Sequence, residues 1–295
     1  MSATEAPSDT PKETPKDGAA FCADLVKTHD FVRYASTLFV PGPERRALLS
    51  IYAFNVEISR VHEQVSQPLP GEIRLQWWTD MLAGSGHGGV EGNPVAAELL
   101  HTIRNHRLPV SALSRLVEDH QFDLYNDPMP SLAALEGYLD ATASALFSLA
   151  ARVIVRPSEA IEHVARHAGL AQGMTQVITR LARDAARQQL FLPQQFLQQH
   201  GSSKEEVFAG RLTPNIRAAV DQLAGEAQTH LATALALLAD VPREVRPVFL
   251  PLAHVRRELK LMARADSDPF LARPASRLRI LWALWRAART REFGG

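Results

Sequence analysis

The chain has 295 residues, and 46% of them are hydrophobic, which is enough for a substantial buried core. Lys and Arg together number 32, as do Asp and Glu, so no net charge draws the chain to nucleic acid. We therefore expect no nucleic-acid partner. The single cysteine, Cys22, excludes an internal disulfide and a zinc site built from cysteines.

Residues 1–18 are rich in Pro, Thr, Ser, Glu and Lys and are predicted to form a disordered tail. They lack the basic start and apolar run of a secretory signal, and Glu5 and Asp9 do not fit a mitochondrial presequence. Nowhere does an apolar run reach the ~18 residues that a membrane-spanning helix needs. We expect a cytoplasmic protein with no signal peptide and no transmembrane helix.

From residue 19 onward, apolar residues recur at helical spacing in almost every segment, and Pro or Gly residues separate the segments. The sequence predicts an all-α protein in which residues 19–295 form one domain, a single large helical bundle with a central cavity. The expected helices, in chain order, are 19–38, 43–66, 70–84, 94–106, 109–126, 131–155, 158–187, 192–200, 203–209, 213–240, 243–264 and 275–291.

Two of these helices carry unusual segments, YAFNVEISRVHEQ at 52–64 and HAGLAQGMTQVITRLARDAARQQLFLP at 167–193. Residues three or four apart share a helix face, so two helices with a D-x-x-x-D pattern can aim four carboxylates at one cavity. Such a set holds Mg2+ ions against a diphosphate. Both segments have the frame of a diphosphate-binding helix, but they lack most of the carboxylates.

The chain resembles the squalene/phytoene synthase family, all-α isoprenoid synthases that join two prenyl diphosphates head to head. FVRYASTLFVPGPERRALLSIYAFN at 31–55, with Arg46 and Tyr52, matches the first motif block of that family, and GLAQGMTQVITRLARDAARQQLFLP at 169–193 matches the second. Alignment on Tyr-Ala-Phe implies that Ser59 and Arg60 replace the paired aspartates of the enzymes, and that Glu63 stands at the last aspartate.

In the second block the alignment implies that Gln176 replaces an asparagine, that Arg180 replaces the first aspartate, and that Asp184 remains. The resemblance thus leaves Glu63 and Asp184 as weak metal candidates, and a neighbouring arginine repels cations but binds phosphate. We expect no catalytic residue, no metal and no cofactor, with Mg2+ only if the chain is an enzyme. A cavity that binds a substrate or anion is expected, with the candidate residues Arg46, Tyr52, Gln172, Gln176 and Arg180.

Further segments, IRLQWWTDML at 73–82 and NPVAAELLHTIRNHRLP at 93–109, are similar to a divergent branch of the family that acts in respiratory complex I assembly. This resemblance implies a non-catalytic assembly factor whose partners are complex I subunits or assembly intermediates. It also implies an isoprenoid or lipid ligand as one option for the cavity, and peripheral contact with the inner face of a membrane.

Two alternatives stay open. The first is an active head-to-head prenyltransferase that condenses two prenyl diphosphates with Mg2+ held by Glu57, Glu63 and Asp184. Helix geometry disfavours it, because Glu57 and Glu63 are six residues apart and point to different sides. The second alternative is a helical scaffold with a closed core and no ligand.

Two other features have competing interpretations. Asp119 and Asp123 have D-x-x-x-D spacing but lie outside both motif blocks, so we expect solvated or capping roles. Gly169 and Gly173 predict close approach of a neighbouring helix or of a ligand.

The final predicted helix places apolar residues at i, i+3, i+4 and i+7. We expect this stripe to dock on the bundle, which leaves the arginines for acidic lipid head groups or an acidic partner. A membrane-surface helix is the alternative. The stripe consists of Leu278, Leu281, Trp282 and Trp285.

Overall fold

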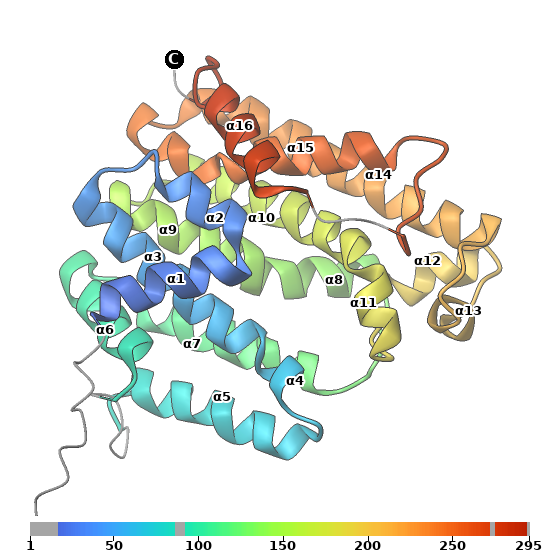
Figure 1. Cartoon of the computed structure of the whole chain (residues 1–295), viewed down its shortest axis with the longest axis horizontal. Coiled ribbons are helices and arrows are strands. Elements are labelled where there is room, and N and C mark those ends of the chain that lie inside the picture. Colours follow the sequence, from blue (N-terminus) through green and yellow to red (C-terminus); the bar gives the residue numbers. More distant parts are fainter. Residues whose placement is uncertain (1–16, 86–91, 272–274, 294–295) are drawn as a thin grey trace, which may run out of the picture.

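The computed structural model describes residues 17–85, 92–271 and 275–293 (Figure 1). Within these ranges it contains helices and no strand, so the all-α prediction is confirmed. The first half of the chain forms α1 (Gly18–His29), α2 (Phe31–Thr37), α3 (Gly42–Ser59), α4 (Val61–Gln64), α5 (Pro68–Leu82), α6 (Pro94–His106), α7 (Val110–Asp119), the 3-10 turn η1 (His120–Leu124), α8 (Leu132–Leu139), the π-helical turn η2 (Asp140–Ser144) and α9 (Ala145–Ile154).

The second half continues the bundle with helices that pack on the first half. It forms α10 (Glu159–Thr179), α11 (Leu181–Ala186), α12 (Gln194–Gln199), α13 (Lys204–Phe208), α14 (Pro214–Leu237), the 3-10 turns η3 (Leu238–Asp240) and η4 (Arg243–Phe249), α15 (Pro251–Met262) and α16 (Arg277–Ala287).

Most predicted helices occur, but several are divided into two. The predicted 19–38 helix breaks at Asp30, whose carboxylate accepts a hydrogen bond from the backbone N–H of Arg33 at 3.1 Å and so caps a new helix. The predicted helices 43–66 and 158–187 break at Arg60 and Arg180. Helical periodicity continues across such breaks, so it does not reveal them.

The start of the bundle overlaps the predicted tail. Residues 1–16 of that tail lie outside the described residues. Asp17, which also belonged to the predicted tail, accepts a hydrogen bond from the backbone N–H of Ala19 at 3.2 Å and caps α1, which begins at Gly18. Because of this N-cap, helix α1 begins at Gly18, one residue before the start that the sequence predicts.

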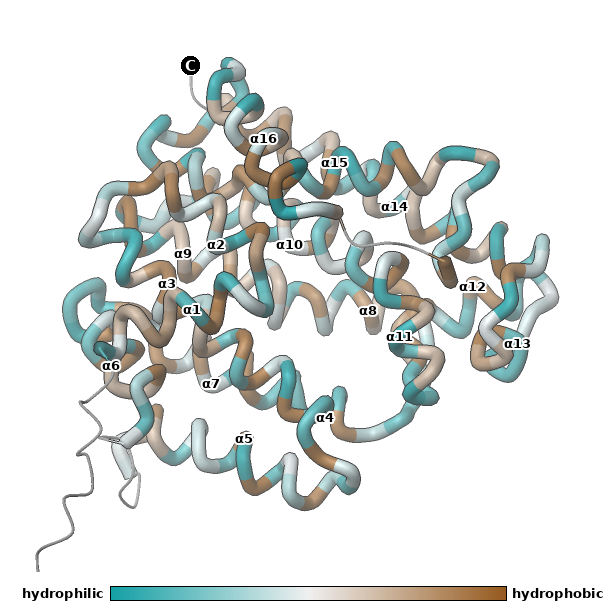
Figure 2. Tube along the Cα trace, in the orientation of Figure 1, coloured by the Kyte–Doolittle hydropathy of each residue, from teal (hydrophilic) through white to brown (hydrophobic). Residues whose placement is uncertain are grey.

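Helix α10 runs through the middle of the bundle, between α9 on one side and α14 and α15 on the other (Figure 1). Its buried residues include Ile161, Leu170 and Met174, and they belong to one hydrophobic cluster that extends from Cys22 to Phe293. Figure 2 shows hydrophobic and hydrophilic positions alternating along the helices of the bundle. The central position of α10 carries its C-terminal end to the candidate site described below.

Gly169 and Gly173 let α10 approach its neighbours closely. A Cβ atom on Gly169 would lie 2.3 Å from the backbone N and Cα of Ser144 in η2. A Cβ atom on Gly173 would lie 2.3 Å from a methyl carbon of Leu139. The expected close helix approach is thus present at both glycines, and Gly173 also lines the pocket described below.

The last helix docks on the bundle by a different face from the predicted one. Ile280, Leu284 and Ala287 are its buried residues, and they face the surface formed by α2 and α15. The predicted stripe is wrong for three of its four residues, because Leu278, Trp282 and Trp285 are 78%, 59% and 47% exposed, whereas Leu281 is partly buried and packs against the core. Ile280, Leu284 and Ala287 stand at i, i+4 and i+7, so they form a second apolar stripe on the other side of the helix, and this stripe packs on the bundle. Among the described residues, every helix is too short or too polar to cross a bilayer.

Cys22 provides a test of the packing of α1 in solution. The thiol is 1% exposed, and burial raises its pKa to about 12. The thiolate is the reactive form, so only about 1 thiol in 10,000 is reactive at pH 8. We expect iodoacetamide to label the folded protein at least about a thousandfold more slowly than the urea-unfolded protein. Equal labelling rates before and after unfolding would contradict this packing.

Candidate functional site

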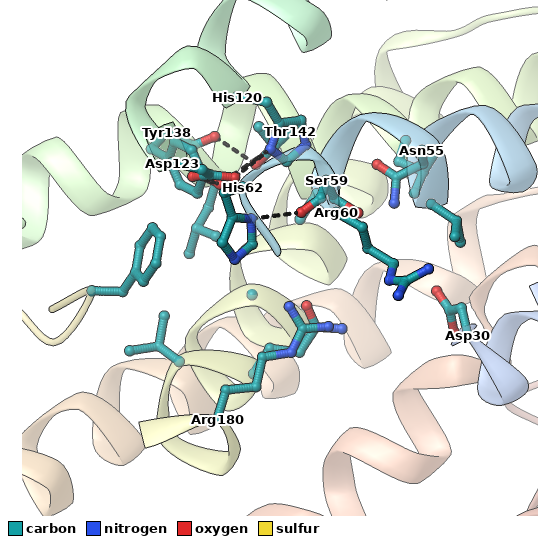
Figure 3. Close-up of a pocket in the computed structure, with 18 of the residues that line it drawn as sticks. Asp30, Asn55, Ser59, Arg60, His62, His120, Asp123, Tyr138, Thr142 and Arg180 are labelled. Atoms are coloured by element: carbon teal, nitrogen blue, oxygen red, sulfur yellow. Dashed lines mark hydrogen bonds and ion pairs between the residues drawn. The ribbon is translucent and has the colours of Figure 1, made fainter. Parts of the chain in front are cut away.

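A polar cavity of about 230 Å3 opens between the ends of α3 and α10 (Figure 3). The structure brings both unusual segments to this pocket, since Ser59 and Arg60 come from the first and Arg180 from the second. Glu63 and Asp184 line it as well. All five positions that the alignment assigns to the motif aspartates therefore share one cavity.

Both segments break their helix at an arginine. Arg60 ends α3 with φ −102° and ψ 2°, and Arg180 ends α10 with φ −98° and ψ −2°. These dihedral angles lie in the sparsely populated bridge region, where the chain leaves the regular helix. Consequently the short helices α4 and α11 begin at the pocket, and they carry Glu63 and Asp184 on its wall.

Glu63 is held by two arginines. One of its carboxylate oxygens lies 3.1 Å from Nε of Arg60 and the other 3.1 Å from Nη1 of Arg183. Burial by itself would raise the pKa of Glu63, but the charge of Arg183 and the hydrogen bond from Arg60 outweigh it, so the pKa is lowered. Glu63 is therefore a carboxylate whose charge the protein already neutralises.

Asp184 lies deeper, with 6% of its surface exposed. Burial raises its pKa, although Arg183, whose Nε lies 3.6 Å from the carboxylate, acts in the opposite direction. The last surviving aspartate of the second motif is thus desolvated and faces an arginine. Both conditions oppose the high local negative charge that a Mg2+ ion requires.

The donor set of the pocket does not fit a Mg2+ cluster. Mg2+ needs near-octahedral oxygen ligands and is usually held by free carboxylates and water. Glu63 is bound to Arg60 and Arg183, and these guanidinium groups repel a cation at the same place. Among the residues that the structure describes, no three His, Cys, Asp or Glu side chains gather in an arrangement suited to a metal ion.

Arg180 projects into the pocket from below, toward His62 and Arg60 (Figure 3). The pocket walls surround it, yet its side chain stays accessible to solvent. Burial and the nearby charge of Arg183 lower the pKa of Arg180, but an arginine remains protonated at neutral pH. Of the four arginines that line this cavity in the described residues, it alone has a side chain without a hydrogen bond or ion pair. Its donors are free for an anion.

The opposite wall contains a buried cluster that sequence analysis missed. Asp123 is 6% exposed, accepts a hydrogen bond from the hydroxyl of Tyr138 at 2.8 Å, and lies 2.7 Å from Nδ1 of His120. The expected solvated or capping role of Asp123 is therefore wrong. The sequence signal available for this pair was the spacing, because His120 stands three residues before Asp123 and so shares its helix face. Nε2 of His120 is buried without a partner in the structure and lines the same pocket.

Three predicted binding residues lie outside the pocket. Arg46 forms a two-point ion pair with Glu98, at 2.7 and 2.8 Å, so its guanidinium is already occupied. Tyr52 is buried beneath the guanidinium of Arg33, which lies 5.6 Å from the ring centroid. Gln172 accepts a hydrogen bond from Arg33 at 2.9 Å. Of the predicted set, only Gln176 and Arg180 line the cavity.

Arg33 is a pocket residue that sequence analysis did not single out. It is 4% exposed and its Nη1 donates to Asp30 at 2.8 Å. Tyr52 and Phe147 each present a ring 5.6 Å from its guanidinium carbon. These contacts neutralise Arg33 and fix its position, so it forms a rigid section of the wall. The sequence signal available for Arg33 was Asp30, which stands three residues before it and can pair with it on one helix face.

The metal set of the enzyme alternative does not converge. Glu57 lies in a separate pocket, together with Trp77 and Trp78. Glu63 and Asp184 lie in the cavity between α3 and α10. The two glutamates point to different sides, as the helical spacing predicted.

The squalene/phytoene synthase family matches residues 26–286. The chain belongs to this family. Its helical bundle agrees with that assignment, because a squalene synthase from Alicyclobacillus acidocaldarius superposes with a TM-score of 0.70, at 20% identity, over 82% of this chain and 92% of that one. The isoprenoid-synthase-like fold expected from the sequence is therefore confirmed.

Two curated family members are similar to this chain in sequence. The rat protein named NADH dehydrogenase (ubiquinone) complex I, assembly factor 6 is 30% identical over 254 residues, which is 86% of this chain and 76% of the rat protein. Presqualene diphosphate synthase from Rhodopseudomonas palustris is 25% identical over 216 residues, which is 72% of this chain and 76% of that enzyme. The expected resemblance to both branches of the family is confirmed.

Proposed function

We propose that this chain is a non-catalytic member of the squalene/phytoene synthase family that acts in the assembly of respiratory complex I. The observation that carries the proposal is the pocket itself. Arg60 and Arg180 stand where the alignment places metal-binding aspartates, and Glu63, the remaining carboxylate of the first motif, is paired with two arginines. Similarity to assembly factor 6 over most of the chain supports the same role.

The loss of catalysis follows from electrostatics. Ionisation of a prenyl diphosphate requires positive charge that stabilises the leaving group as it departs, which bound metal ions supply. In this pocket the guanidinium groups of Arg60 and Arg183 are already paired with the carboxylates of Glu63 and Asp184. Only Arg180 remains unpaired among the described arginines of the cavity. One fixed cation is suited to holding an anion, but gives far less charge stabilisation than several Mg2+ ions.

Within this function we propose that the cavity binds the phosphate or diphosphate group of an isoprenoid or lipid ligand without a metal. Arginine binds phosphate oxygens through parallel hydrogen bonds. Gln176 adds an amide on the same helix, one turn before Arg180. We further propose complex I subunits or assembly intermediates as protein partners, and a cytoplasmic location.

Turnover of farnesyl diphosphate tests the loss of catalysis. We expect the purified protein with labelled farnesyl diphosphate and Mg2+ to release no more diphosphate than a protein-free control, because the carboxylates cannot gather the metal. Thin-layer chromatography of the extract should show no C30 hydrocarbon or C30 diphosphate. A head-to-head C30 product that disappears in Asp184→Ala would establish the prenyltransferase alternative instead.

Deletion of the gene in its own host tests the assembly role. We expect lower NADH:ubiquinone oxidoreductase activity in the membranes, and accumulation of incomplete complex I on native gels. Succinate oxidation in the same membranes is the matched control, because it bypasses complex I. Unchanged complex I activity and content in the deletion strain would contradict the role, whatever the turnover assay shows.

A further inference from the structure

Helix α16 carries an apolar face that no described segment of the chain covers. Leu278, Trp282 and Trp285 follow one another at i, i+4 and i+7 and are 78%, 59% and 47% exposed. The opposite face, with Ile280 and Leu284, attaches the helix to the bundle. Isolated exposed hydrophobic residues are ordinary, but two tryptophans and a leucine on one face form a contiguous patch, and such patches mark interaction sites.

The same helix and the turn after it concentrate positive charge. They contain five arginines and no acidic residue between positions 277 and 291, although the whole chain has zero net charge. Glu292, which follows, is neutralised by Arg256 at 2.7 Å. The exposed arginines are Arg277, Arg279, Arg286, Arg289 and Arg291.

The tryptophans and arginines of this face are in contact with one another. The guanidinium carbon of Arg286 lies 4.7 Å from the ring centroid of Trp282, and that of Arg289 lies 3.3 Å from the ring centroid of Trp285. Each cation therefore sits beside an exposed ring rather than on the far side of the helix. Tryptophan and arginine share the boundary between head groups and acyl chains, because both have an apolar body and a polar end.

We propose that this face of α16 docks on the surface of a bilayer that contains anionic lipid. We name it the α16 face and define it as Leu278, Trp282 and Trp285 with Arg279, Arg286 and Arg289. Anionic head groups complement the arginines, and the rings enter the layer just below.

The position of the helix favours a bilayer over a protein groove. Helix α16 lies on the outside of the bundle, beside the C-terminal end of the chain (Figure 1). Among the described residues it packs mainly against α2 and α15, and Arg277 at its start also donates to the backbone of Lys27 in α1. A helix that is fixed to a folded body and presents a convex face can lie flat on a surface, and the adjoining bundle then stays in water.

Co-sedimentation with lipid vesicles tests the α16 face. We expect the full chain to pellet with vesicles of phosphatidylcholine mixed with phosphatidylglycerol, and to stay in the supernatant with phosphatidylcholine alone. Trp282→Ser with Trp285→Ser should lower the partition coefficient at least about tenfold, because the rings no longer enter the layer. Arg279→Gln, Arg286→Gln and Arg289→Gln together should lower it about a hundredfold at low salt, since each basic residue contributes about 1 kcal/mol.

The matched controls change equally exposed residues on other elements. Leu69→Ser with Ile73→Ser alters two residues of α5 that are 65% and 63% exposed. A triple glutamine variant of arginines outside α16 makes the same change in net charge as the α16 triple variant. We expect wild-type partitioning for both controls. The arginines of the charge control are Arg104, Arg156 and Arg211.

Each outcome of the vesicle experiment supports or overturns the proposed membrane contact. A wild-type chain that does not pellet with the anionic vesicles overturns the proposal, as does equal loss in the α16 variants and the controls. If the α16 face instead binds a soluble protein and no vesicle, the surface belongs to that protein and the proposal is wrong. Circular dichroism melting curves establish that each variant is folded. The result is independent of the complex I role, which the deletion strain tests.

Discussion

Replacing Arg180 by glutamine is expected to weaken metal-free binding of diphosphate at least about tenfold. The side chain of Arg180 has no hydrogen bond or ion pair in the described structure, and it lines the cavity. Hydrogen bonds to a charged group contribute about 1.5–3 kcal/mol each, and about 1.4 kcal/mol corresponds to a factor of ten. Glutamine keeps a donor but removes the charge. Isothermal titration calorimetry with inorganic diphosphate and with farnesyl diphosphate, both in excess chelator, measures the change.

The control for this experiment is Arg187→Gln. Arg187 ends α11, is exposed, and does not line the cavity, yet its loss changes the net charge of the same region equally. We expect its affinity for diphosphate to stay within about twofold of the wild type, because exposed charges are screened by salt. If both variants lose affinity equally, general charge attraction accounts for binding. If the wild type itself binds diphosphate only when Mg2+ is added, the metal-free site is refuted.

Replacing Gly169 by alanine is expected to destabilise the fold by about 3 kcal/mol or more. The added Cβ would lie 2.3 Å from the backbone of Ser144, and backbone cannot move aside as a flexible side chain can. Over-packing in well-packed cores costs about 1–3 kcal/mol, and contact with backbone lies at the upper end. For a chain of this size the melting temperature should fall by roughly 6 °C or more. Urea denaturation and differential scanning calorimetry measure these quantities.

Gly225→Ala is the matched control. Gly225 lies within helix α14, and nothing lies within 4 Å of the position that its Cβ would occupy. Alanine is the better helix former, so this variant should gain about 0.5–1 kcal/mol. The two glycine substitutions thus have opposite expected signs although the chemistry is identical. A Gly169→Ala protein as stable as the wild type would show that η2 and α10 are further apart in solution than in the structure.

The sequence was informative wherever local spacing decides the structure. Apolar periodicity predicted the helices, and Asn93 and Pro94 fixed the start of α6 at the predicted residue. The alignment of the two unusual segments also predicted that Ser59, Glu63, Arg180 and Asp184 would meet, and they line one cavity. These residues meet although each helix breaks at an arginine, because α4 and α11 begin directly after the breaks and stay at the pocket.

The pairing of those residues was not predictable from the sequence. Arg46 was expected in the cavity, but Glu98, 52 positions away, holds it elsewhere. Asp123 was expected in a solvated or capping role, but Tyr138, 15 positions away, donates a hydrogen bond to it in the pocket wall. An arginine or aspartate has the same local pattern whether it is free or paired, since its partner comes from a distant segment.

For this protein the sequence by itself determined the all-α class, the family and the exchange of metal-binding aspartates for arginines. The tertiary structure decided which charges remain free: Arg180 in the cavity, and the arginines beside Trp282 and Trp285 on α16. The physical reason is the distance along the chain over which each interaction acts. Helix formation and helix faces depend on residues within four positions, whereas burial and ion pairing depend on which distant elements pack together.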